Sequence, residues 1–143
     1  RQLPAEIEAE LAARRVELDE LLATSDVVSL NCPYTPETHH LLDARALGLM
    51  KPTAYVINTA RGKVIDEPAL VDALTEGRLA GAGLDVFESE PHVHPGLLAL
   101  DQVVLTPHIG SATSETRGAM AELAVRNVLA VLAGAPPLTP VAA

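Results

Sequence analysis

The sequence predicts an α/β fold whose core is a parallel β-sheet. Short apolar runs alternate with helical segments along the chain, and short connections join them, as in strand–helix–strand units with right-handed crossovers. A hydrophobic content of 48% with only 2% aromatic residues indicates an aliphatic core. The length of 143 residues suits one domain.

Four short apolar segments are predicted strands because polar residues or turn-forming residues bound each of them. They are residues 27–30, 54–57, 80–84 and 103–105. Gly81 and Gly83 lie within the third segment, which indicates that another group packs close to its backbone. A further apolar step at Val16 predicts a short extended segment.

Capping and helix-forming residues mark the predicted helices. Pro4 precedes one over residues 5–14, and a brief one covers 18–23. Asp43 caps a helix to residue 49, Asp66 caps one that ends at Gly77, and Ser114 caps a long one that ends at Gly134. The long helix has an apolar stripe formed by Met120, Leu123, Ala124, Val128 and Val131.

Composition and charge exclude several classes of protein. Nineteen acidic residues against ten basic ones give a net charge of −9, which argues against a nucleic-acid groove. No apolar run approaches the roughly 18 residues that span a bilayer. A single cysteine, Cys32, excludes a disulfide framework and a cysteine-built zinc site.

Polar residues follow each of the four predicted strands. They occupy residues 31–38, 58–62, 85–90 and 108–111. Ligands of open parallel sheets bind at the carboxyl ends of the strands. The sequence therefore predicts one shared site at that edge of the sheet.

Three ionisable residues at these strand ends suggest a reaction. Arg61 can hold a carboxylate bidentately and polarise a neighbouring carbonyl. Glu90 next to His108 would keep the imidazole protonated, so that the histidine can donate a proton near neutral pH. The three together suit the reduction of a 2-oxo acid, with the hydride coming from a cofactor.

Each of these residues also has an ordinary structural interpretation. Arg61 could form a salt bridge at a strand end, Glu90 could be a solvated loop carboxylate, and His108 could bond a neighbouring carbonyl. Two histidine pairs are weaker candidates. Residues 92 and 94 have no third metal ligand that the sequence identifies, so no metal is expected, and residues 39 and 40 are expected at the surface or at a subunit contact.

Four segments resemble the signatures of the D-isomer-specific 2-hydroxyacid dehydrogenase family. They are residues 58–62 (Asn-Thr-Ala-Arg-Gly), 83–91 (Gly-Leu-Asp-Val-Phe-Glu-Ser-Glu-Pro), 106–111 (Thr-Pro-His-Ile-Gly-Ser) and, for an earlier cofactor loop, 30–38. Their order and separations also agree, and the resemblance covers the chain to about residue 140. Residues 110–113 and 115–117 look most like the glyoxylate and hydroxypyruvate reductases.

The resemblance implies a role for each matching residue. Arg61 would bind the substrate carboxylate and carbonyl, His108 would be the general acid in reduction and the base in oxidation, and Glu90 would pair with His108. An NAD(P) groove would be lined by Cys32, Pro33, Thr59, Ala60, Arg61, Asp85, His108 and Gly110, with Thr38 nearby. Asp85 would meet the nicotinamide end, and Arg1 in the ribose-binding loop gives a slight preference for NADP(H).

The implied fold is Rossmann-like, doubly wound and incomplete. Its first two strands and its Gly-rich pyrophosphate turn are expected upstream of Arg1, since residues 81–83 lie within a strand and do not open a helix. Residues 1–133 would be the C-terminal part of the NAD(P)-binding domain and 134–143 a tail returning to a substrate domain outside this chain. Val16 would lie in an edge strand, and the chain alone is expected neither to complete its sheet nor to bind dinucleotide tightly.

The function implied is reduction of glyoxylate or hydroxypyruvate by a cytoplasmic homodimer that binds neither nucleic acid nor membrane. D-3-phosphoglycerate dehydrogenase is an alternative within the same family. A non-enzymatic, dinucleotide-sensing module of the corepressor type is a second alternative, because such proteins keep the Arg, Glu and His. An inactive structural remnant is a third.

Overall fold

The computed structural model describes residues 4–141, which divide into two units. The first unit ends at Pro107 and the second begins at His108. Each unit is described by itself.

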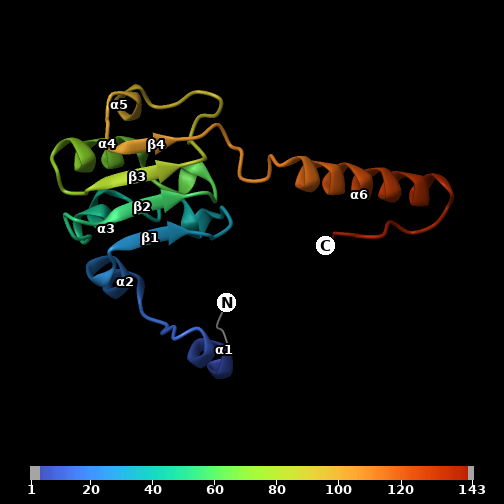
Figure 1. Cartoon of the computed structure of the whole chain (residues 1–143), viewed down its shortest axis with the longest axis horizontal. Coiled ribbons are helices and arrows are strands. Elements are labelled where there is room, and N and C mark those ends of the chain that lie inside the picture. Colours follow the sequence, from blue (N-terminus) through green and yellow to red (C-terminus); the bar gives the residue numbers. More distant parts are fainter. Residues whose placement is uncertain (1–3, 142–143) are drawn as a thin grey trace. The chain divides into compact units, whose positions relative to one another are not determined.

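The first unit is built on a four-stranded, all-parallel sheet in the order β1-β2-β3-β4 (Figure 1). The strands are β1 (Val27–Leu30), β2 (Tyr55–Asn58), β3 (Gly81–Leu84) and β4 (Val103–Leu105). Parallel pairing places all four carboxyl ends at one edge. The predicted α/β class with a parallel sheet is therefore confirmed.

Short helices precede the first strand and connect the strands to one another. They are α1 (Ala5–Glu10), α2 (Leu18–Thr24), α3 (Ala44–Gly48), α4 (Glu67–Thr75) and α5 (Pro95–Leu98), with 3₁₀ turns η1 (Pro36–Thr38) and η2 (Gly62–Val64). Two predicted caps are confirmed: the Asp43 side chain accepts a hydrogen bond from Ala46 N, and that of Asp66 accepts one from Ala69 N. Gly77, with φ +68°, ends α4 in the left-handed region as expected.

The core of this unit is aliphatic and lies between one face of the sheet and the helices. Val28 and Val56 on neighbouring strands are buried with Leu47 of α3 and Leu70 of α4. Side chains alternate along a strand, so the next residues point to the opposite face. On that face Val27, Tyr55 and Val104 are 58%, 48% and 67% exposed.

The glycines of β3 explain how closely its neighbours pack. A Cβ atom on Gly81 would come within 2.5 Å of the Gln102 carbonyl oxygen and 3.1 Å of the Tyr55 ring. One on Gly83 would lie 3.1 Å from the Ile57 side chain. The predicted close approach to this strand is confirmed.

Several predicted elements differ from the structure. Val16 lies in an irregular segment, and within residues 4–141 no strand pairs with it to supply ladder hydrogen bonds. Helix α1 ends at Glu10 because Ala12 adopts a φ of +50° and Ala13 N bonds back to the Glu8 carbonyl. Helix α5, which begins at Pro95 where the predicted polar loop ends, was not expected.

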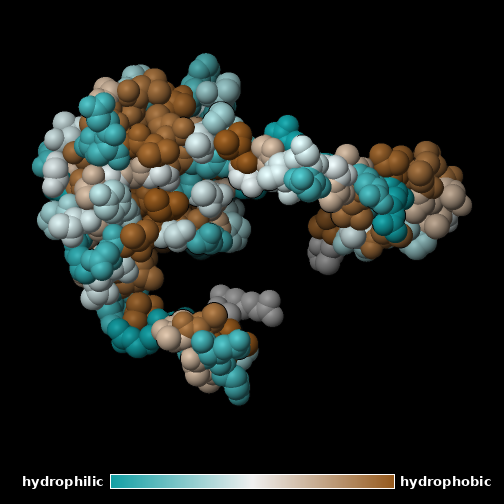
Figure 2. All heavy atoms as spheres, in the orientation of Figure 1, coloured by the Kyte–Doolittle hydropathy of each residue, from teal (hydrophilic) through white to brown (hydrophobic). Residues whose placement is uncertain are grey.

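The second unit consists of helix α6 (Ser114–Leu132) and the residues on either side of it. Its cap is Thr113, whose side chain accepts a hydrogen bond from Thr116 N, and the prediction of Ser114 is wrong by one residue. Gly134 follows the helix with φ +76°, as expected. Among the described residues none of α6 is buried, and hydrophobic residues cover much of this unit's visible surface (Figure 2).

Within residues 4–141, no helix combines the length and the apolar character needed to cross a membrane.

Candidate functional site

A buried asparagine shapes the turn that follows β2. Asn58 is 1% exposed; its Nδ2 donates to the Arg61 carbonyl oxygen at 3.0 Å and its Oδ1 accepts from Ala60 N at 3.0 Å. These two bonds close the turn over Thr59 and Ala60, so that Arg61 leaves it in a fixed direction. Sequence reasoning placed Asn58 in the motif without assigning this role, although asparagine at a strand end is a turn signal.

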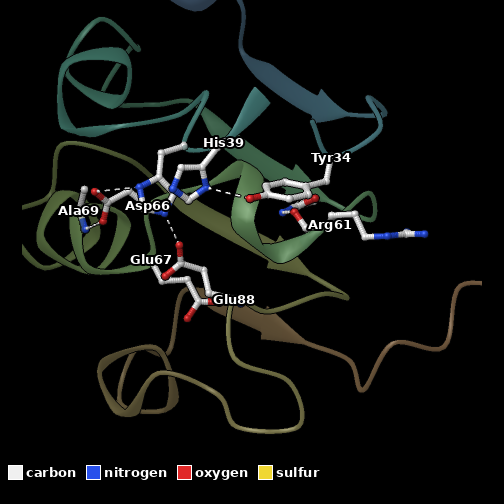
Figure 3. Close-up of polar contacts among 9 residues, drawn as sticks. Tyr34, His39, Arg61, Asp66, Glu67, Ala69 and Glu88 are labelled. Carbon is white, nitrogen blue, oxygen red and sulfur yellow. Dashed lines mark hydrogen bonds and ion pairs between the residues drawn. The ribbon is translucent and has the colours of Figure 1, made fainter. Parts of the chain in front are cut away.

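Arg61 lies at the carboxyl edge of the sheet, where it was predicted. Its side chain is exposed, and Nη1 donates to the carbonyl oxygen of Ala60 at 2.6 Å. Figure 3 shows its guanidinium directed away from the side chains of Glu67 and Glu88. The remaining N–H groups of a guanidinium are enough to hold a carboxylate bidentately.

Gly62 brings the loops after β2 and β3 into contact. A Cβ atom at this position would collide with the backbone of Phe87 and with Glu88 N. Only glycine therefore permits this packing. The loop that carries Arg61 and the loop that carries Glu90 meet through their main chains, a contact that the sequence did not predict.

Asp85 joins the ends of three strands. It is 6% exposed; its backbone N–H donates to the Asn58 carbonyl at 2.9 Å, and its Oδ1 accepts from Thr106 Oγ1 at 2.5 Å. Thr106 follows β4, and its own N–H donates to the Leu84 carbonyl. Asp85 is thus fixed at the edge where the nicotinamide end of a cofactor is predicted.

Glu90 closes the turn that follows Phe87. Its Oε1 accepts a hydrogen bond from Phe87 N at 3.0 Å, and the residue is exposed. The carboxylate therefore lies at the surface of a constrained turn.

His108 is the first residue of the second unit. Its φ of +51° lies in the left-handed region, a strained conformation that clusters at functional sites. Gly110 belongs to the same unit. The positions of the two units relative to one another are not determined, so the pairing of His108 with Glu90 stays a prediction.

The predicted cofactor loop after β1 is held by its own hydrogen bonds. Thr38 Oγ1 donates to the Pro33 carbonyl and accepts from Thr35 N, both at 2.8 Å. Cys32 is half-buried against the core, Ala60 of the next loop is half-buried, and Thr59 is exposed. Small residues and fixed backbone at the ends of parallel strands fit the approach of a dinucleotide.

A second set of ionisable residues lies beside these loops (Figure 3). His40 Nε2 forms a short ion-pair contact with Glu88 Oε1, and its Nδ1 lies 3.8 Å from Asp66 Oδ2. His40 is half-buried and makes both contacts within its own unit, and its expected position at the surface or at a subunit contact stays a prediction. His39 is exposed and stacks on the His40 ring, with centroids 4.0 Å apart.

Glu67, the first residue of α4, is the buried member of this set. It is 5% exposed, and its Oε1 accepts a hydrogen bond from Glu88 N at 2.8 Å. Burial raises the pKa of Glu67, and the nearby carboxylates of Glu88 and Glu90 raise it further, against the Glu88 N–H bond and the attraction of His94.

The other histidine pair serves a local purpose. His94 Nδ1 accepts from Gly96 N and caps α5, while His92 N donates to the Ser89 carbonyl. Among residues 4–141, no group of three or more His, Cys, Asp or Glu side chains has the geometry to hold a metal ion.

Comparison with known proteins gives a consistent family. The family model described as "D-isomer specific 2-hydroxyacid dehydrogenase, NAD binding domain" matches residues 1–110. A glyoxylate reductase of Thermococcus onnurineus is 57% identical over 134 residues, which are 94% of this chain and 40% of the relative. The chain thus spans about two fifths of the length of the curated relatives it matches.

Solved structures agree with the sequence comparison. The holo form of D-mandelate dehydrogenase from Rhodotorula graminis superposes with a TM-score of 0.91 at 43% identity, over 100% of this chain and 42% of that one. An NADPH-dependent glyoxylate/hydroxypyruvate reductase from Sinorhizobium meliloti, in complex with NADP and malonate, gives 0.82 at 42% identity, over 87% of this chain and 39% of that one.

Proposed function

Since the chain belongs to the D-isomer specific 2-hydroxyacid dehydrogenase family by its NAD-binding domain, we propose that it provides cofactor-binding and proton-transfer groups for the NAD(P)H-dependent reduction of a small 2-oxo acid. Glyoxylate and hydroxypyruvate are the proposed substrates, as the names of the relatives in Thermococcus onnurineus and Sinorhizobium meliloti suggest.

The observation that carries the proposal is the junction of the Arg61 and Glu90 loops at the carboxyl edge of the sheet. Gly62 packs against the backbone of Phe87 and Glu88, and Asn58 fixes the turn from which Arg61 projects. The cationic Arg61 and the anionic Glu90 are thus carried by two loops that pack against each other. A 2-oxo acid needs both: a cation for its carboxylate and a carboxylate to support the proton donor.

In the proposed reaction Arg61 binds the substrate carboxylate and polarises the carbonyl oxygen. NAD(P)H held at the strand-end loops would supply the hydride. His108 donates a proton to the oxygen of the new alkoxide, and in the reverse direction it accepts one. Glu90 pairs with the imidazolium and keeps His108 protonated near neutral pH.

The proposed dinucleotide groove uses the strand-end loops of the first unit with Gly110 and His108. Cys32, Pro33, Thr59 and Ala60 contribute small side chains and backbone groups, and Asp85 meets the nicotinamide end. NADP(H) is the preferred cofactor in this proposal, supported by the NADP complex of the Sinorhizobium meliloti relative. The residue that suggested this preference, Arg1, lies outside the described residues.

We also propose how the domains and subunits of the full protein are organised. Residues 1–133 belong to the dinucleotide-binding domain, and 134–143 form a tail leading out of it. The full protein works as a homodimer in the cytoplasm.

Turnover tests this proposal directly. The full protein is assayed with a panel of 2-oxo acids (glyoxylate, hydroxypyruvate, 3-phosphohydroxypyruvate and pyruvate) with NADH and with NADPH. Oxidation of NADPH that depends on glyoxylate or hydroxypyruvate is expected. Tight dinucleotide binding without turnover of any 2-oxo acid would contradict the proposed reductase activity and favour a dinucleotide-sensing module.

A further inference from the structure

The cluster around Glu88 takes no part in the proposed proton transfer, yet it surrounds the loop that carries Glu90. His40 comes from the segment between η1 and α3, Asp66 and Glu67 begin α4, and Glu88 follows β3. Figure 3 shows Asp66, Glu67 and Glu88 gathered close to one another. Two other parts of the chain therefore contact one residue of the loop that carries Glu90.

Glu67 holds the backbone of this loop. Its Oε1 accepts from Glu88 N at 2.8 Å, and the side chain is 5% exposed. Removal of this acceptor would leave the Glu88 N–H without that bond in a largely buried place. Burial is the main cause of the raised pKa of Glu67, and its carboxyl oxygen can accept this bond in either protonation state.

His40 holds the side chain of the same residue. Its Nε2 contacts Glu88 Oε1, and its backbone N–H donates to the Lys63 carbonyl at 2.9 Å. His40 therefore ties the Glu88 loop to the segment that follows Arg61. Its φ of +49° is a strained conformation for histidine, which persists only when surrounding contacts maintain it.

Glu88 lies inside the turn that Glu90 closes through its bond to Phe87 N. A shift of residue 88 would move both ends of that turn. We propose that Glu67 and His40 are positioning residues that fix the Glu90 turn against the Arg61 loop. This inference rests on the proposed function, since the role of Glu90 does.

Variants of the full protein separate positioning from general stability. Glu67→Leu removes the acceptor, Glu67→Gln restores one of equal size, and Glu76→Leu is a matched control, because Glu76 is an exposed residue that follows the same helix. In Glu67→Leu, kcat for glyoxylate falls roughly 10- to 100-fold while KM changes little. The upper limb of the pH profile of kcat, which is assigned to deprotonation of His108, moves to lower pH. The reason is that a displaced Glu90 no longer favours the imidazolium. Glu67→Gln recovers both values, and Glu76→Leu matches the wild type.

His40→Asn keeps the proposal testable where Glu67→Leu does not fold. Asparagine tolerates a positive φ but is too short to reach Glu88. The same displacement of the pH limb and a several-fold loss of kcat are expected. Variants that lose thermal stability while kcat and the pH limb stay at wild-type values would overturn the inference.

Hydrogen exchange of the peptide spanning residues 85–91 provides a readout that is independent of turnover. Exchange is expected to be faster in Glu67→Leu than in Glu67→Gln. If the wild-type protein reduces no 2-oxo acid, the proposed function fails on its own account. Equal exchange in the two variants would overturn the positioning role of Glu67, whatever the activity.

Discussion

His108 is the residue on which the proposed chemistry depends most. General acid catalysis contributes about 10²- to 10⁴-fold to a rate. We expect His108→Ala in the full protein to lower kcat by that factor, since no other group is assigned to protonate the alkoxide. Steady-state kinetics with glyoxylate measures the effect, and circular dichroism melting checks the fold. A variant with near wild-type turnover would show that the acid–base assignment is wrong.

Arg61 is expected to affect binding more than the chemical step. It is exposed and its side chain donates to the neighbouring Ala60 carbonyl, whereas the turn at Asn58 is held through backbone atoms, so removal of the guanidinium leaves that turn in place. Arg61→Ala should raise KM for the 2-oxo acid about 10- to 100-fold, the value of a lost charge-assisted contact. Arg78→Ala removes an arginine that pairs with the exposed Glu76 and serves as the control. An unchanged KM would remove Arg61 from the substrate site.

The raised pKa of Glu67 makes a prediction for stability. A carboxyl whose pKa is higher in the folded state binds more protons when folded, so its contribution is present at low pH and is lost as pH rises through the folded-state pKa. The free energy of unfolding of the wild type, relative to Glu67→Gln, should therefore decline from about pH 4 upward. Urea unfolding across that range measures it. Parallel curves for the two proteins would contradict the raised pKa.

Among the loops, Gly62 sets how the β2 and β3 ends meet. Gly62→Ala places a methyl group against the Phe87 and Glu88 backbone, which cannot swing aside as a side chain can. The expected loss is about 1–3 kcal/mol of unfolding free energy, with reduced kcat. Gly48→Ala is the matched control, because nothing lies within 4 Å of a Cβ there. Equal urea midpoints for the two variants would mean that the loops do not depend on this contact.

The sequence predicts most elements because their signals are local. The apolar run at 27–30 matches β1, and Asp43 and Asp66 cap the helices expected of them. Helix α5 was missed because a helix of four residues is too short to show a periodicity. The caps could be predicted because an aspartate bonds a backbone N–H three residues away.

The contacts that shape the candidate site come from tertiary packing, which explains why they escaped sequence reasoning. His40 and Glu88 are 48 residues apart in the chain, and neither residue alone signals the other. Gly62 reads locally as a turn glycine, whereas its packing role exists only once β2 and β3 are paired. The sequence alone could predict that Arg61 and Asp85 follow neighbouring strands, but it could not predict the contacts of Glu67 and His40 with Glu88.

At the scale of the molecule, the first unit leaves one face of its sheet without cover from its own described residues. Val27, Tyr55 and Val104 on that face are about half exposed or more, and no described residue of α6 is buried. A doubly wound sheet is stable when helices cover both faces. We therefore expect the 143-residue chain, expressed by itself, to melt without a sharp cooperative transition and to bind NADPH more weakly than micromolar. Calorimetry and NADPH fluorescence titration, run beside the full protein, measure both properties. A sharp melt together with micromolar NADPH binding by the chain alone would show that these residues form an independent cofactor-binding unit.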